Sequence, residues 1–143
     1  MTNQNRSGFS LVELVLVMAI IGLTTLMGIT QLQRYLDRIA TRDAIRAAGA
    51  VVARARDEAV ALHATVSVRI DTSTASLDLI SRGARFAHTP LGDTHRVTLS
   101  TTRDSITFDV RGLGYGAANL TLVARRGSAR DTLVVSRLGR VRY

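Results

Sequence analysis

The chain of 143 residues contains no cysteine, no tryptophan and no lysine, and its aromatic content is 4%. Without cysteine, disulfide bonds and thiolate metal sites are excluded, and the chain is free to fold in a reducing or an oxidising compartment. With so few aromatic residues, the core has to be aliphatic and modest in size. The length fits one domain with an appendage, because domains usually hold roughly 100–200 residues.

Arginine supplies all of the positive side-chain charge. The 19 arginines face 11 acidic residues, which gives a formal net charge of +8. The planar guanidinium group binds phosphate in a bidentate manner, so arginine is the better phosphate ligand of the two basic residues. The composition therefore permits a negatively charged partner without identifying one.

The strongest signal is an apolar run near the N-terminus. Residues 9–27, FSLVELVLVMAIIGLTTLM, contain a single charge, Glu13, and the run extends to residue 29. A helix of about 20 apolar residues, rising about 1.5 Å per residue, crosses a hydrocarbon core of about 30 Å. The run is apolar around its whole circumference, whereas a surface helix of a soluble domain is apolar on one side. Segment 9–29 is therefore predicted to be a single transmembrane helix.

A secretory signal peptide is the competing interpretation of this run. Signal peptides have an apolar region of about 7–15 residues followed by a small-residue cleavage site. Here the apolar run is longer, no Ala-x-Ala site follows it, and a small residue, Gly8, precedes it. Arg6 in the short polar leader favours a cytoplasmic location for this end of the chain.

Glu13 is the anomaly of the apolar run. A carboxylate inside a spanning helix costs about 2.5–3.5 kcal/mol on insertion scales, and no neighbouring side chain in the run can pair with it. One explanation places Glu13 near the lipid headgroups, where it stays hydrated. The other is that its partner is supplied by another molecule.

The sequence from Gly8 through Phe9 to Glu13 resembles the class III leader of type IV prepilins and type II secretion pseudopilins. The resemblance implies that prepilin peptidase cleaves between Gly8 and Phe9 and that Phe9 is then N-methylated. Glu13 would become the fifth mature residue, which in this family pairs with the new amine of a neighbouring subunit. Two charges that are costly alone would then pair on assembly and set the axial register.

Beyond residue 29 the pattern becomes amphipathic without a proline or a linker. Apolar residues recur at near-helical spacing, and they are Leu32, Leu36, Ile39, Ile45, Val52, Ala55, Ala59 and Leu62. Arginines at every fourth position from Arg34 to Arg46 form a basic stripe, which is typical of a solvated face. We predict one continuous helix from about Ser10 to Leu62.

From Thr65 the pattern becomes that of β-strands separated by polar or glycine-containing turns. Alternating stretches lie at residues 66–70, 77–79, 96–100, 105–110, 120–125 and 132–136. Residues 89–93, which include Pro90, are expected to form a turn, as is the glycine-rich stretch 111–116. Six or seven short strands predict an antiparallel sheet with one face on the helix.

Segments 53–71 and 105–114 and the closing SRLGRVRY resemble the GspH/FimT-like group of minor pilins and pseudopilins. The expected fold is α+β, a long N-terminal helix packed on an antiparallel β-sheet, as in pilins. The expected organisation is a leader at 1–8, a transmembrane helix at 9–29, its amphipathic continuation at 30–62 and a β-rich head at 65–143. By this resemblance the protein is a single-pass inner-membrane protein with its head in the periplasm.

No catalytic motif is evident, and the protein is not expected to be an enzyme or to bind a cofactor, a metal or a small-molecule substrate. The histidines are His63, His88 and His95. His88 and His95, with Asp93 between them, would allow a metal site, but they are interpreted as exposed loop residues. The glycines at 111–116 follow a strand and precede no helix pattern, so they do not form a phosphate-binding loop.

Arginines are concentrated at the C-terminal end of the sequence. Residues 111–143 contain Arg111, Arg125, Arg126, Arg130, Arg137, Arg140 and Arg142, against Asp131 as the acidic residue. Arg140 and Arg142 are two residues apart, so on a strand they point to the same face and can contact successive phosphates. The Gly-Arg-x-Arg ending is similar to that of FimT-type minor pilins, in which C-terminal arginines bind DNA during uptake. Solvation of an edge strand explains the same arginines without any ligand.

The sequence therefore predicts a structural subunit of a type II secretion pseudopilus or a type IV pilus that supports protein secretion. The expected partners are other pilins or pseudopilins, prepilin peptidase and inner-membrane lipid. The alternative is a FimT-like minor pilin that binds DNA for natural transformation, with Arg137, Arg140 and Arg142 as candidate contacts.

Overall fold

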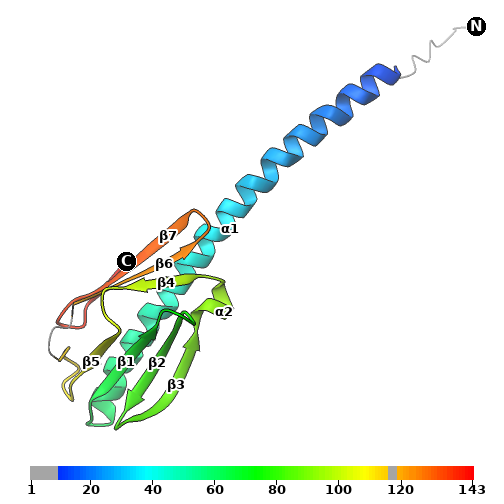
Figure 1. The fold of residues 1–143 in the computed structure, drawn as a ribbon. Coiled ribbons are helices and arrows are strands. Elements are labelled where there is room, and N and C mark those ends of the chain that lie inside the picture. The colour runs from blue at the N-terminus through cyan, green and yellow to red at the C-terminus, as the bar shows by residue number, and fades with distance from the viewer. Residues whose placement is uncertain (1–9, 116–118) are drawn as a thin grey trace, which may run out of the picture. The chain divides into compact units, whose positions relative to one another are not determined.

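The computed structural model describes residues 10–115 and 119–143, and the chain divides into two units between Tyr35 and Leu36. One long helix, α1, spans Leu11–Ala61 (Figure 1). The predicted limits of this helix, at about Ser10 and Leu62, are each confirmed to within one residue. The leader at 1–8 and the proposed cleavage site between Gly8 and Phe9 lie outside the described residues.

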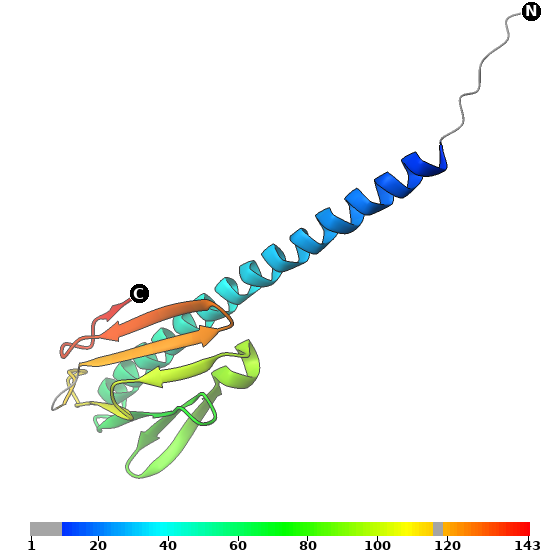
Figure 2. The same cartoon turned by 45° about the horizontal axis from the view of Figure 1, so that its top comes forward.

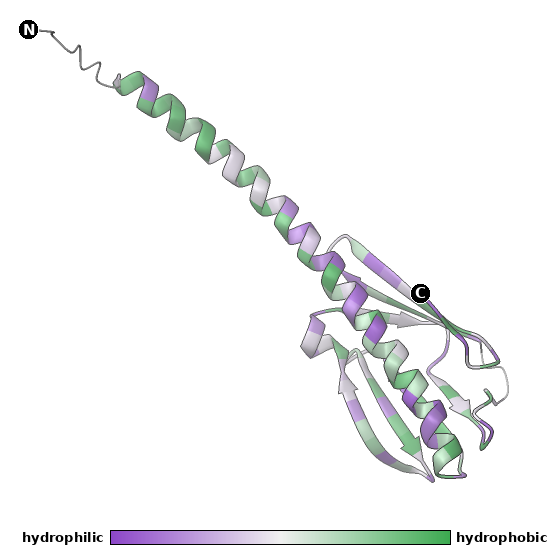
Figure 3. Ribbon diagram, turned by 180° about the vertical axis from the view of Figure 1, so that it is seen from behind, coloured by the Kyte–Doolittle hydropathy of each residue, from purple (hydrophilic) through white to green (hydrophobic). Residues whose placement is uncertain are grey.

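The first part of α1, up to Tyr35, is apolar along most of its length (Figure 3). By length and composition it is able to cross a membrane, and none of the apolar stretch is buried within the protein. Its hydroxyl groups are satisfied locally, since Thr24 Oγ1 donates to the Ile20 carbonyl at 2.9 Å and Thr25 Oγ1 to the Ile21 carbonyl at 2.7 Å. Such bonds within the helix lower the free energy of placing a hydroxyl in an apolar environment.

The second part of α1 packs through one face against the β-strands of the same unit. The buried residues of that face are mostly small: Ala40, Thr41, Ala44, Ile45, Ala48, Gly49, Val52, Ala55 and Ala59. Small side chains let a sheet approach a helix closely and keep the interface dense. The larger side chains of the core therefore come mainly from the strands.

Within the described residues, eight strands form two four-stranded sheets in which every strand pair is antiparallel. Sheet A has the order β3-β2-β1-β5 and consists of β1 (Val66–Asp71), β2 (Ser76–Ser81), β3 (Ala84–Pro90) and β5 (Ser105–Phe108). Sheet B has the order β4-β6-β7-β8 and consists of β4 (Thr98–Thr101), β6 (Leu120–Arg126), β7 (Ala129–Val135) and β8 (Val141–Arg142) (Figure 2). A five-residue helix, α2 (Leu91–His95), connects β3 to β4.

The α+β class is confirmed, but the expectation of one sheet with six or seven strands is corrected. Strand β3 was missed because it is an edge strand with mostly exposed side chains, so it lacks the alternation that reveals a half-buried strand. Pro90 ends β3 instead of lying in the predicted turn, and α2 begins at the next residue. Proline is tolerated there because a strand end on an edge needs no further N–H donor.

The core is a single cluster that joins α1 to both sheets. Its largest fully buried side chains are aliphatic apart from Phe108, and they include Ile45, Leu77, Leu79, Leu122 and Leu133. This matches the expectation from the low aromatic content. Among residues 10–115 and 119–143, the buried core residues lie at or beyond residue 40, within the unit that begins at Leu36.

Candidate assembly site and arginine-bearing face

Glu13 lies in the first turn of α1 and is exposed. In that position a carboxylate interacts favourably with the partial positive charge of the helix N-terminus, an effect of about 0.3–1 kcal/mol in water. None of the ion pairs in the described residues involves Glu13. The helix dipole alone is too weak to offset the cost of about 2.5–3.5 kcal/mol for placing this carboxylate in lipid.

The apolar side chains that surround Glu13 are exposed as well. Leu11 and Val12 are 80% and 74% exposed, and Leu14 and Val15 are each more than half exposed. A continuous apolar surface of this length is unfavourable in water, and it marks a surface that lipid or other apolar helices cover. Glu13 is therefore a charged group within a surface that is built to be covered.

At the other end of the chain, the segment that carries the C-terminal arginines folds back on β7. The Ser136 N–H donates to the Arg140 carbonyl at 2.9 Å, and the Arg140 N–H donates to Ser136 Oγ at 3.2 Å. Arg142 follows in β8, opposite Val134. Arg140 and Arg142 are both exposed and two residues apart in this extended segment, so they project from the same side as the sequence predicted.

Gly139 makes this tight turn possible. Its φ angle is +72°, and a Cβ atom at this position would lie 3.2 Å from Cε1 of the buried Phe108. Arg137 is exposed within the same turn, and its N–H donates to Asn119 Oδ1 at 3.0 Å. The turn places Arg137 next to Arg140 without bringing it into the β7–β8 ladder.

A second turn, formed by residues 109–113 at the start of the predicted glycine-rich turn, packs close to Gly139. The Gly112 carbonyl lies 3.6 Å from the position that a Gly139 Cβ would occupy. Asp109 orders this turn, because Oδ1 accepts from the Leu113 N–H and the Arg111 N–H, both at 2.9 Å. The hydrogen bond from the Leu113 N–H is the main cause that lowers the pKa of Asp109 below its ordinary value. Burial opposes this shift, and the hydrogen bonds and the charge of Arg111 add to it.

The β6–β7 hairpin separates three arginines that the sequence had grouped together. Arg125 and Arg130 are exposed and stand directly opposite each other in the ladder. Arg126 points to the other side, where its Nε lies 3.0 Å from Asp37 Oδ1 and its Nη1 donates to the His95 carbonyl at 3.0 Å. Arg126 therefore links the hairpin to α1 and α2 and is not available to a ligand on the side of Arg125 and Arg130.

Strand alternation and register define an outer face of sheet B, the side away from the core. Its residues are Thr98, Ser100, Thr121, Val123, Arg125, Arg130, Thr132, Val134 and Arg142. None of these nine is acidic. Asp131, the acidic residue of the hairpin, pairs with the buried Ala124 and so belongs to the opposite side.

The structure places His88 and His95 on different elements. His88 lies on β3, not in a loop as predicted, and its Nδ1 is 2.6 Å from Asp78 Oδ1 on β2. His95 lies in α2 and contributes its carbonyl to Arg126. Within residues 10–115 and 119–143, no three metal-ligating side chains come together.

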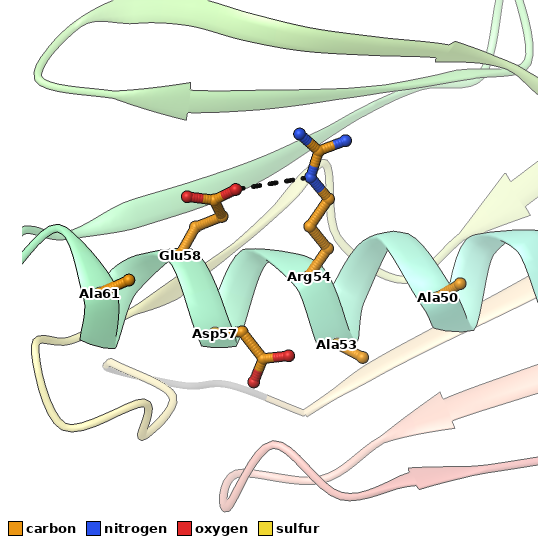
Figure 4. Close-up of a pocket in the computed structure, with 6 residues that line it drawn as sticks. All are labelled: Ala50, Ala53, Arg54, Asp57, Glu58 and Ala61. Carbon is orange, nitrogen blue, oxygen red and sulfur yellow. Dashed lines mark ion pairs between the residues drawn. The ribbon is translucent and has the colours of Figure 1, made fainter.

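A shallow groove runs along the exposed side of α1 (Figure 4). It is lined by Ala50, Ala53, Arg54, Asp57, Glu58 and Ala61, and Arg54 Nε lies 3.6 Å from Glu58 Oε1. None of these six residues is a serine, a threonine, a cysteine, a lysine or a histidine. The lining is that of a smooth helix surface with one solvent-exposed ion pair, and it offers no constellation for catalysis.

The first half of the long helix is apolar and exposed and carries one carboxylate, and a head of helix and antiparallel sheets follows it. This architecture is that of the pilin class of filament subunits. Residues 3–29 match the family model described as the prokaryotic N-terminal methylation motif. The pilin-like protein PilA1 of Thermus thermophilus is 31% identical to this chain, over 96% of this chain and 97% of its own length.

The fold is also similar to two solved structures. The type IV minor pilin FimU of Pseudomonas aeruginosa superposes with a TM-score of 0.62 and 18% identity, over 76% of this chain and 90% of that one. The minor pseudopilin EpsH of the Vibrio cholerae type II secretion system superposes with a TM-score of 0.58 and 15% identity, over 71% of this chain and 94% of that one. The chain belongs to the type IV pilin-like proteins, which are structural proteins and not enzymes.

Proposed function

We propose that the protein is a structural subunit of a type II secretion pseudopilus or a type IV pilus that supports protein secretion. In this proposal prepilin peptidase cleaves between Gly8 and Phe9 and Phe9 is methylated. Segment 9–29 then anchors the subunit in the inner membrane, with the head in the periplasm, until it enters a filament with other pilins. The observation that carries the proposal is Glu13, a single carboxylate in an apolar and exposed helical run.

The energetics favour pairing between subunits. Opposite charges about 4 Å apart attract by about 4 kcal/mol at an effective dielectric constant of about 20. This is comparable with the cost of about 2.5–3.5 kcal/mol for one carboxylate in lipid, so pairing offsets much of the cost that the two charges have when they are apart. The amine that cleavage creates at Phe9 supplies the opposite charge, so the pair forms only after processing and fixes the axial position of one subunit against the next.

Substitution of Glu13 tests the proposal. Glu13→Gln and Glu13→Leu should leave membrane insertion intact or stronger, and should reduce recovery of the protein in a sheared filament fraction at least tenfold. Glu58→Gln is the matched control, because Glu58 is a carboxylate of the same helix that forms an exposed pair with Arg54. Incorporation of Glu13→Leu at the wild-type level would refute the assembly mechanism.

N-terminal sequencing of the membrane-extracted protein tests processing separately. The expected result is a chain that begins with N-methylated Phe9. An intact Met1, or cleavage beyond residue 27, would contradict the proposed leader.

DNA binding is a second candidate function, and the exposed arginines of the C-terminal segment favour it. Arg140 and Arg142 share one side of the folded-back segment, and Arg137 lies in the adjoining turn. Titration with duplex DNA at two salt concentrations tests this function. A phosphate contact should weaken with salt at a log–log slope of about −0.9 per neutralised phosphate. Equal binding by wild type and Arg140→Ala/Arg142→Ala would remove the support.

A further inference from the structure

The β6–β7 hairpin carries a cross-strand pair of like charges. Arg125 and Arg130 are opposite partners in the antiparallel ladder, and both are exposed. Directly opposite residues have Cβ atoms about 4.5–5.5 Å apart, and like charges in such positions are destabilising. No ion pair within the described residues involves either arginine. The hairpin therefore places two exposed arginines directly opposite each other, and neither forms an ion pair with a carboxylate of the described residues.

This pair lies on the same face as Arg142. Arg142 on β8 pairs with Val134 on β7, and Val134 is four residues from Arg130 along the same strand. At about 3.3 Å per residue, Arg130 and Val134 are about 13 Å apart. Arg140 lies about two residues farther along the same direction, which extends the row to about 20 Å. Two arginine pairs thus lie at the two ends of this row: Arg125 and Arg130 on the outer face of sheet B, and Arg142 with the adjoining Arg140, which directly precedes β8.

The surface between the two pairs is built from short side chains. Thr121, Val123, Thr132 and Val134 occupy the central positions of β6 and β7, and β4 adds Thr98 and Ser100. None of these six strand residues has a long side chain, so a straight polymer can lie across this part of the face and reach both arginine pairs. Hydroxyl groups of threonine and serine also donate hydrogen bonds to phosphate oxygens.

We infer that the outer face of sheet B, together with the adjoining Arg140, binds the sugar–phosphate backbone of duplex DNA at two points, Arg125 with Arg130 and Arg140 with Arg142. The inference rests on the DNA-binding function proposed above and adds a second anchor to it. A row of about 13–20 Å corresponds to about four to six base pairs at about 3.4 Å each. The contacts are made to phosphates, so binding is independent of base sequence.

The test compares paired substitutions in the full chain, purified in a non-ionic detergent. Binding to a fluorescent duplex is measured by anisotropy over a series of salt concentrations. Arg125→Gln/Arg130→Gln should reduce the log–log salt slope by about 1.8 and the affinity at low salt at least tenfold, because two phosphate contacts are lost. Arg82→Gln/Arg103→Gln is the control, since it removes the same charge from exposed positions outside sheet B and should leave the slope unchanged.

A stability measurement separates binding from a structural role. Removal of two facing like charges should leave the melting temperature of Arg125→Gln/Arg130→Gln equal to or above that of the wild type. A clear decrease in melting temperature together with the loss of binding would show that the pair maintains the fold, and would overturn the inference.

The outcomes also distinguish the inference from the function on which it rests. If the wild type does not bind duplex DNA at low salt, the DNA-binding function fails and the inference fails with it. If Arg140→Ala/Arg142→Ala weakens binding but Arg125→Gln/Arg130→Gln does not, the function stands and the second anchor is refuted. If vesicles containing phosphatidylglycerol bind through Arg125 and Arg130 while duplex DNA does not, the face recognises lipid phosphate and the inference is wrong.

Discussion

Substitution of Arg126 should destabilise the head far more than substitution of its neighbour Arg125. Arg126 Nε lies 3.0 Å from Asp37 Oδ1, and Arg126 Nη1 donates to the His95 carbonyl at 3.0 Å. The side chains of Arg126 and Asp37 are 30% and 23% exposed. One side chain thus links the β6–β7 hairpin to both α1 and α2.

The expected magnitude lies between two known limits. An exposed ion pair contributes about 0–1 kcal/mol, and removal of one partner of a buried pair costs about 3–5 kcal/mol. With roughly a quarter of each side chain exposed, and with the hydrogen bond to His95 also lost, Arg126→Ala should lower the free energy of unfolding by about 2 kcal/mol. For a unit of about 100 residues this corresponds to a decrease in melting temperature of about 8 °C.

Thermal unfolding followed by circular dichroism measures the effect, and hydrogen exchange of β6 and β7 locates it. Arg125→Ala is the matched control, because the adjacent arginine projects from the other side of the same strand and should change stability by less than about 0.5 kcal/mol. A double-mutant cycle with Asp37→Ala isolates the pair, with an expected coupling of about 1–2 kcal/mol.

The reasoning would be refuted if Arg126→Ala and Arg125→Ala had equal effects. A coupling energy below about 0.3 kcal/mol between Arg126 and Asp37 would have the same consequence, since the pair would then behave as a fully solvated one.

Two further predictions concern the core and the turns. Phe108→Ala should lower the free energy of unfolding by about 3–5 kcal/mol, because Phe108 is fully buried, and denaturant unfolding of the head measures this loss. The hydroxyl and the backbone N–H of Ser73 donate hydrogen bonds that lower the pKa of Asp71 below its ordinary value. The Leu113 N–H lowers the pKa of Asp109 in the same way. Because each pKa is lower in the folded state, the charged carboxylate stabilises the head at pH values above its unfolded-state pKa. This contribution is lost as the pH falls through the folded-state pKa, so the melting temperature should decrease below about pH 4. Asp71→Asn and Asp109→Asn should flatten this decrease, and an unchanged pH profile would contradict the assignment.

The predictions that rested on local sequence were the most accurate. A helix is readable from sequence because each backbone N–H bonds to the carbonyl four residues earlier, so its side-chain pattern is local. The apolar run and the amphipathic pattern that follows it predicted both limits of α1 to within one residue. The position of Glu13 in that run is likewise readable without a fold. The two-residue spacing of Arg140 and Arg142 predicted a shared side, because alternation along an extended chain is also local.

The division of the arginines between two faces was decided only by tertiary structure. Arg125, Arg126 and Arg130 carry the same charge and lie within six positions, yet Arg126 pairs with Asp37 while the other two face outward. The direction in which a strand residue points depends on which alternate positions the core buries, and a shift of one residue reverses every side chain. The split into two sheets, the edge strand β3 and the pairing of His88 with Asp78 depend in the same way on partners distant in sequence. The local sequence predicted the long helix and the single carboxylate in its apolar part. The packing of the strands on α1 determined which arginines remained exposed and available to a partner.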